Sequence, residues 1–177
     1  MITIGQKLPA FALKSVADTS GEFPVLTEQS FAGKWKVFVF WPKDFTFVCP
    51  TEIIGFNDVE GEFADRDAQL IGASTDSDFV HLAWRKSRED LGAVKYPWLA
   101  DIKKEFAAAL GVLEPNEGVA FRATIIADTD NIVRYVAVND LSVGRNPQEV
   151  LRVLDALQTD ELCPCNWKKG EDTLKAA

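Results

Sequence analysis

Unbroken apolar runs alternate along the chain with segments in which apolar residues recur at helical spacing. Residues 34–41 are rich in β-branched and aromatic residues and predict a buried strand, and residues 68–75 predict a second one. Looser apolar segments predict further strands within residues 2–16 and 96–101. Residues 121–138 predict a hairpin that turns at the sequence DTDN.

Four segments have the apolar spacing of amphipathic helices. The pattern predicts helices at residues 50–66, 77–92, 102–112 and 146–158. Ser77 is the N-cap candidate of the second helix and Gly92 its predicted end, while Pro147 suits the first turn of the last helix. Residues 17–33 read as a polar loop with short strand or turn pieces.

This order of elements predicts the class of fold. Strands and helices alternate before a hairpin and a closing helix, which is typical of an α/β protein with a mixed central sheet flanked by helices. The 177 residues are enough to bury one sizeable core.

Charge excludes some classes of partner. The net charge is -8 and the acidic residues are spread along the chain, so no basic surface is predicted for nucleic acid or for an anionic membrane. No apolar run approaches the length of a membrane span, and the N-terminus lacks the pattern of a signal peptide. We therefore expect a cytoplasmic protein.

The three cysteines are placed unevenly, with Cys49 alone and Cys163 and Cys165 together in ELCPCNW. A secreted domain held by disulfides would carry more cysteines in a shorter chain. The chain has no C-x-x-C pair, and its single histidine, His81, is far from both cysteine sites in the sequence. A metal site is therefore not expected.

Cys49 lies where the strand at 34–41 gives way to the predicted helix. If Pro50 occupies the first turn of that helix, Cys49 lies beside unpaired backbone N–H groups and the positive end of the helix dipole. That position favours the thiolate, which is the nucleophilic and oxidisable form. A small buried apolar residue is the competing interpretation of the same position.

The residues before Cys49 favour the reactive interpretation. Thr46 precedes Cys49 by one helical turn, and its hydroxyl can both donate and accept a hydrogen bond, as a bound peroxide requires. Pro42 can supply a rigid apolar wall over the thiolate.

A resemblance to a known family rests on several motifs. Pro42, Thr46 and Cys49 form the pattern P-x-x-x-T-x-x-C in WPKDFTFVCPTE. Together with GVAFRATIIAD, SVGRNPQEVLRVLDALQ and ELCPCNWKKG, it covers nearly the whole chain in order. The chain resembles the typical two-cysteine peroxiredoxins of the alkyl hydroperoxide reductase C type, in particular the three-cysteine actinobacterial kind.

The resemblance implies roles for residues around Cys49. Cys49 is the expected peroxidatic cysteine, which attacks the peroxide and becomes a sulfenic acid. Thr46 is expected to hydrogen-bond the substrate, Pro42 to shield the pocket, and Arg122 to hold the thiolate and the substrate oxygens. Glu52 resembles the residue that orients this arginine, although a surface acid in the first helical turn is the simpler alternative.

The resemblance also implies a division of the chain. Residues 1–160 are expected to form a thioredoxin-like fold with peroxiredoxin insertions, and residues 161–177 a C-terminal tail. Cys163 in that tail matches the resolving cysteine. Cys165 departs from the usual pattern and is expected to resolve in parallel or to relay the disulfide, with metal binding by the C-P-C pair or a partly structural role as the alternatives. Arg145 is similar to a second supporting arginine.

The implied activity is that of an antioxidant, thiol-dependent peroxidase that contributes to cell redox homeostasis. Its substrates are expected to be hydrogen peroxide, organic hydroperoxides and peroxynitrite, and no cofactor is expected. The disulfide would be reduced by thioredoxin, a flavoprotein reductase or an alkyl hydroperoxidase D-type protein. The resemblance also implies a homodimer that assembles into a decameric ring, with Phe45 and Phe47 at the contact between dimers; core packing is the competing interpretation of these two residues.

Three other functions are compatible with single features of the sequence. A thioredoxin-like disulfide oxidoreductase would share the fold but usually carries C-x-x-C at the helix start. A ring-forming holdase chaperone would use the thiols only as switches. A thiol hydrolase would need His81 beside Cys49, whereas the helical pattern around His81 favours a packed residue.

Overall fold

A computed structural model describes residues 1–175 as a seven-stranded sheet with helices. Its strands are β1 (Ala12–Val16), β2 (Val25–Thr27), β3 (Trp35–Phe40), β4 (Ala68–Ser74), β5 (Trp98–Ala100), β6 (Arg122–Ala127) and β7 (Val133–Asn139). Every predicted strand segment contains an observed strand. In the segment 2–16, however, only the second half is a strand, and Lys7 forms an isolated bridge with Ile132.

The sheet is mixed, with strand order β2-β1-β5-β4-β3-β6-β7. β4 pairs in parallel with β3 and with β5, whereas β6 pairs antiparallel with β3 and forms the predicted hairpin with β7. The two most apolar strands, β3 and β4, are central and nearly every residue in them is buried. The predicted α/β class and mixed sheet are confirmed.

Two of the predicted helices are each divided in two. The helices are α1 (Cys49–Asp58), α2 (Glu60–Ala64), α3 (Asp78–Ser87), α4 (Glu89–Gly92), α5 (Glu105–Leu110) and α6 (Pro147–Thr159). The single helix predicted over 77–92 is wrong because Arg88 is extended, with φ -143 and ψ 127. The change of direction lets Leu91 of α4 become fully buried. The helix predicted over 50–66 is interrupted at Val59, whose carbonyl accepts the Phe63 amide as α2 begins.

The two predicted helix starts are confirmed, whereas Gly92 ends α4 and not the helix that Ser77 begins. Ser77 caps α3, its side chain accepting the Val80 amide at 3.2 Å, and Pro147 lies in the first turn of α6. These local features follow from short stretches of sequence.

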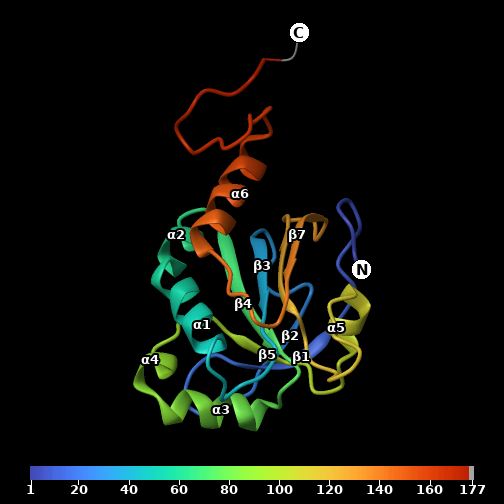
Figure 1. Cartoon of the computed structure of the whole chain (residues 1–177), viewed down its shortest axis with the longest axis vertical. Helices are drawn as coiled ribbons and strands as arrows, with labels where there is room; N and C mark the ends of the chain where they lie inside the picture. Colours follow the sequence, from blue (N-terminus) through green and yellow to red (C-terminus); the bar gives the residue numbers. More distant parts are fainter. Residues whose placement is uncertain (176–177) are drawn as a thin grey trace. The chain divides into compact units, whose positions relative to one another are not determined.

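Helices cover both faces of the sheet in the unit that contains it (Figure 1). Phe38 and Phe40 of β3 pack on Phe106 of α5 on one face. On the other face, the ring centroids of Trp41 and Trp98 lie 5.3 Å apart, and both rings pack on His81 of α3. The alternation of side chains along the strands therefore divides the core into two layers.

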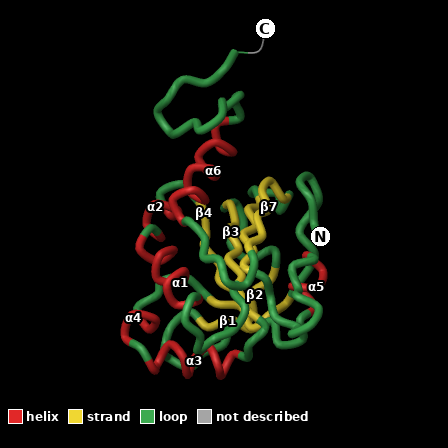
Figure 2. The backbone as a smooth tube through the Cα atoms, viewed as in Figure 1, coloured by secondary structure: helices red, strands yellow, loops and turns green. Residues whose placement is uncertain are grey.

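The chain forms two compact units, Met1–Arg145 and a second that begins at Asn146. The second unit consists of α6 and the segment that follows it, which is drawn as loop in Figure 2. Within this unit, Leu162 and Leu174 form an antiparallel bridge and Arg152 donates to the Trp167 carbonyl at 2.9 Å.

The division into residues 1–160 and 161–177 stays a prediction, and the last two residues of that tail lie outside the described part. Across residues 1–175, no helix is long and apolar enough to cross a membrane.

Candidate active site

Cys49 is the first residue of α1, directly after the segment that follows β3. Pro50 lies in the first turn, as the sequence predicts, and Val48 at the N-cap offers no side-chain hydrogen bond. The Cys49 thiol is buried, with 1% of the residue exposed. A sulfur atom at this position lies at the positive end of the helix dipole, where a nearby negative charge is stabilised.

Arg122 is the neighbour that Cys49 acquires through the sheet. Arg122 is the first residue of β6, and its Nη1 lies 3.4 Å from the Cys49 sulfur. The same nitrogen donates to Glu52 Oε2 at 2.6 Å, while Nε donates to the Leu141 carbonyl at 2.7 Å. Because all three bonds leave from one rigid guanidinium plane, they hold that plane against the sulfur.

Burial lowers the pKa of the Arg122 guanidinium, but the adjacent Cys49 sulfur and the Glu52 carboxylate together raise that pKa above its ordinary value. The cation therefore stays charged beside the sulfur.

Glu52 connects this arginine to a second one. Its carboxylate accepts from Arg145 through the backbone amide at 2.9 Å, Nε at 2.8 Å and Nη2 at 3.0 Å. Arg145 Nη1 donates in addition to the Ala123 carbonyl at 2.7 Å. Glu52 is 4% exposed, so the surface-acid alternative does not apply. One buried carboxylate thus lies between two buried guanidinium groups.

Pro42 and Thr46 lie in the segment between β3 and α1. Pro42 is buried. The Thr46 hydroxyl donates to the Lys43 carbonyl at 2.9 Å, so it bonds the backbone of its own turn. A hydroxyl that donates in this way still has lone pairs with which to accept a second hydrogen bond.

The other two cysteines belong to the second unit. Cys163 is half-buried, with its sulfur 3.4 Å from Thr159 Oγ1 and 3.9 Å from the Ala156 carbonyl oxygen. Cys165 is exposed, and all three cysteines are free thiols. The structure therefore brings Cys49 together with both arginines and Glu52 but forms no disulfide.

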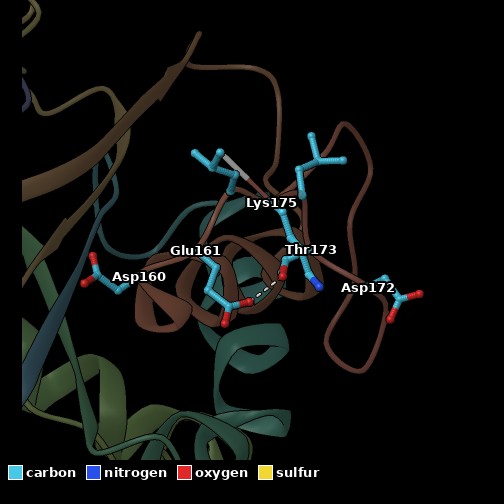
Figure 3. Close-up of a pocket in the computed structure, with 7 residues that line it drawn as sticks. Asp160, Glu161, Asp172, Thr173 and Lys175 are labelled. Atoms are coloured by element: carbon cyan, nitrogen blue, oxygen red, sulfur yellow. Dashed lines mark hydrogen bonds between the residues drawn. The ribbon is translucent and has the colours of Figure 1, made fainter. Parts of the chain in front are cut away.

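A pocket of about 720 Å³ lies in the second unit, lined by residues 160–162 and 172–175. In Figure 3, Glu161 and Thr173 face each other and are joined by a hydrogen bond, while Asp160 and Asp172 project away from them. Its polar groups do not converge on one point and its lining includes no cysteine. The candidate site is therefore Cys49 with the two arginines and Glu52.

Several groups that complete the site have no signal in the sequence. The Leu141 and Ala123 carbonyls that orient the arginines are backbone groups, so no residue type reveals them.

His81 is fully buried, with Nδ1 2.7 Å from Asp44 Oδ2 and Nε2 3.1 Å from the Leu99 carbonyl.

Both ring nitrogens of His81 are therefore engaged away from Cys49, as expected of a packed residue and not of a catalytic dyad. Within the described residues, no three His, Cys, Asp or Glu side chains are grouped to hold a metal ion.

Comparison with known proteins places this site in a family. Residues 4–136 match the AhpC/TSA family. The chain therefore belongs to this family of alkyl hydroperoxide reductases and peroxiredoxins, which are thiol-dependent peroxidases. Family members act on hydroperoxides and depend on a reductant.

Individual relatives agree with this assignment. Alkyl hydroperoxide reductase C of Mycobacterium tuberculosis is 50% identical over 186 residues, covering 99% of this chain and 95% of the relative. The reduced 2-Cys peroxiredoxin of Plasmodium vivax superposes with a TM-score of 0.92 at 34% identity, covering 99% of this chain and 94% of that one. AhpC of Mycobacterium bovis gives a TM-score of 0.86 at 47% identity, covering 95% and 99%. The predicted family and the thioredoxin-like peroxiredoxin fold are confirmed.

Proposed function

We propose that this chain reduces hydrogen peroxide and organic hydroperoxides through Cys49 as the peroxidatic cysteine, with peroxynitrite as a further substrate. The observation that carries the proposal is the 3.4 Å contact between Arg122 Nη1 and the Cys49 sulfur at the start of α1. A fixed cation and a helix N-terminus both favour the thiolate and the charge that develops on the leaving oxygen.

The first step transfers one oxygen atom. The Cys49 thiolate attacks the nearer peroxide oxygen, the O–O bond breaks, and the sulfur becomes a sulfenic acid. The departing alkoxide or hydroxide takes up a proton from water and leaves as alcohol or water, and with peroxynitrite the departing group is nitrite. Arg122 would stabilise the charge on that oxygen, and the Glu52 and Arg145 network would keep Arg122 in place.

Thr46 and Pro42 would complete the substrate pocket. The Thr46 hydroxyl donates its hydrogen bond to the Lys43 carbonyl and can accept a hydrogen bond from the peroxide O–H. Pro42, buried in the same segment, would limit the approach of larger groups.

The second step forms a disulfide. The Cys163 thiol would attack the Cys49 sulfenic acid, giving a disulfide and one molecule of water. Disulfide geometry requires Cα atoms within roughly 7 Å, and Cys49 begins a helix with 1% of the residue exposed. We therefore propose that the start of α1 unwinds in each cycle and that Cys163 comes from the tail (residues 161–177) of a second subunit.

Reduction and assembly complete the proposal. Cys165, which is exposed, would resolve in parallel or pass the disulfide to an external reductant. That reductant is a thioredoxin, a flavoprotein reductase or an alkyl hydroperoxidase D-type protein in the cytoplasm. Phe45 and Phe47 are 57% and 94% exposed, which supports a decameric ring built from homodimers in which these rings are covered. No bound cofactor is needed.

Stopped-flow tryptophan fluorescence of the reduced protein with hydrogen peroxide tests the cycle, since the chain has five tryptophans as reporters. We expect a rapid phase that is absent only in Cys49→Ser and a slower phase that is absent in Cys163→Ser. Cys165→Ser should keep the rapid phase and change the slower phase or the turnover with reductant. A Cys49→Ser variant that responds like the wild type would refute the peroxidatic assignment.

Two other functions make different predictions for the same variants. A disulfide oxidoreductase would reduce insulin disulfides in the presence of dithiothreitol, and this chain should not. A holdase would suppress aggregation of a client protein equally well in wild type and Cys49→Ser. Peroxide consumption that depends on Cys49 distinguishes the peroxidase from both.

A further inference from the structure

An exposed ion pair joins the two segments that lead into the active site. Lys43 Nζ contacts Glu117 Oε2 across 74 residues of sequence, with side-chain exposures of 48% and 54%. Lys43 precedes Cys49 in the segment between β3 and α1, and Glu117 lies in the turn that precedes Arg122 and β6. Exposed pairs contribute little to global stability, so this pair matters for what it positions.

Lys43 belongs to the same turn as Thr46 and is hydrogen-bonded to it. The Thr46 hydroxyl donates to the Lys43 carbonyl at 2.9 Å, so the direction of its free lone pairs depends on the backbone of Lys43. Between them, Phe45 has φ 56, a left-handed conformation that is unfavourable for a bulky side chain. A turn with such a residue keeps its shape only when its surroundings hold it.

The inner side of this turn is held by buried groups. Asp44 accepts from Trp41 Nε1 at 2.7 Å and contacts His81 Nδ1 at 2.7 Å, and its own amide donates to Asp76 Oδ2 at 2.9 Å. Shielding by mobile salt ions is weak for buried partners and strong for exposed ones. The contact between Lys43 and Glu117 on the outer side is therefore the anchor that salt can loosen.

Glu117 lies in a turn whose backbone is held by hydrogen bonds to Glu114. The Glu117 amide donates to Glu114 Oε2 at 2.6 Å, and the Asn116 amide donates to Glu114 Oε1 at 3.1 Å. The Gly118 amide donates to the Glu114 carbonyl at 2.9 Å. These bonds hold the backbone of the turn from which the Glu117 side chain reaches Lys43.

We propose that Lys43 and Glu117 form a clasp that holds the turn of residues 43–46 and thereby positions Thr46 for the peroxide. Both are positioning residues that act through Thr46, and the inference rests on the peroxidase function proposed above. The closed clasp favours attack by Cys49. The open clasp favours unwinding at the start of α1, which disulfide formation requires. One substitution should therefore slow the first step and accelerate the second.

The test follows both fluorescence phases for Lys43→Met, Glu117→Gln, the double variant, and the charge exchange Lys43→Glu with Glu117→Lys. Lys14→Met is the matched control, because Lys14 is 56% exposed and pairs with Asp78 at 2.7 Å. Each protein is measured in about 0.01 M and about 1 M NaCl, between which the screening length falls from about 30 Å to about 3 Å.

At low salt we expect each single variant to slow the rapid phase about two- to fivefold and to accelerate the slower phase by a similar factor. High salt should move the wild type and Lys14→Met in the same direction and leave Lys43→Met and the double variant nearly unchanged. The charge exchange should restore much of the wild-type behaviour at low salt.

Unchanged phases in Lys43→Met, or an equal salt response in wild type and double variant, would overturn the clasp. So would a change of both phases in the same direction, which indicates general loosening. The salt response of the wild type is informative even where a variant folds poorly. Absence of any phase that depends on Cys49 would instead refute the peroxidase itself.

Discussion

Replacing Glu52 by glutamine removes the one carboxylate between two buried guanidinium groups and changes little in shape. Glu52 accepts four hydrogen bonds, two at each oxygen, from Arg122 and Arg145. Glutamine replaces one oxygen by an NH₂ group, so two of the four bonds are lost. The new NH₂ group then faces N–H groups of the arginines, which are also donors. Hydrogen bonds to charged groups contribute about 1.5–3 kcal/mol each. The loss should therefore be about 3 to 5 kcal/mol, the range for breaking a buried ion pair.

Urea unfolding followed by tryptophan fluorescence measures this loss in the free energy of unfolding. Glu62→Gln is the matched control, because Glu62 is a glutamate in α2 whose side chain is 51% exposed and 4.0 Å from Arg66. The control should lie within about 0.5 kcal/mol of the wild type.

The same substitution should slow the rapid phase with peroxide, because Arg122 loses a partner that holds it against Cys49. Removal of a preorganised donor typically costs about a hundredfold or more in rate. Since Glu52→Gln leaves the guanidinium present, we expect a reduction of about tenfold. A Glu52→Gln protein as stable as Glu62→Gln, with an unchanged rapid phase, would refute the argument that Glu52 organises the arginines.

Three further predictions concern stability. Gly72→Ala should cost about 1–3 kcal/mol in urea unfolding, because the new Cβ would lie 2.6 Å from Cζ3 of the buried Trp41 ring; a neutral result would show that the indole can shift. Burial alone would raise the pKa of Asp128. Hydrogen bonds from backbone amides and from Arg134 lower this pKa by more than burial raises it, so the net shift is downward. The stability gap between Asp128→Asn and wild type should thus be present at neutral pH and close as pH falls below about 4, the ordinary aspartate value; a gap independent of pH would refute this. Ser77→Ala should lower stability by about 1 kcal/mol through loss of the α3 N-cap, and an unchanged urea midpoint would show the cap to be redundant.

Much of the fold could be predicted because the relevant signals are local. The apolar runs at 34–41 and 68–75 became the central strands β3 and β4, and the position of Pro50 correctly placed the helix start beside Cys49. The breaks at Val59 and Arg88 were missed, because the same apolar spacing fits one long helix or two short ones. Only packing, such as the burial of Leu91, decides between them.

The sequence by itself determined which chemical groups are available and where Cys49 lies relative to its strand and helix. The resemblance between motifs added Arg122 as a partner for Cys49. Only the tertiary structure decided how these groups meet, because Glu52 is 70 residues from Arg122 and 93 from Arg145. Their contact depends on the register of β6 beside β3 and on the backbone carbonyls that orient each guanidinium. No short window of sequence specifies such distances, since they are set by how whole strands and helices pack.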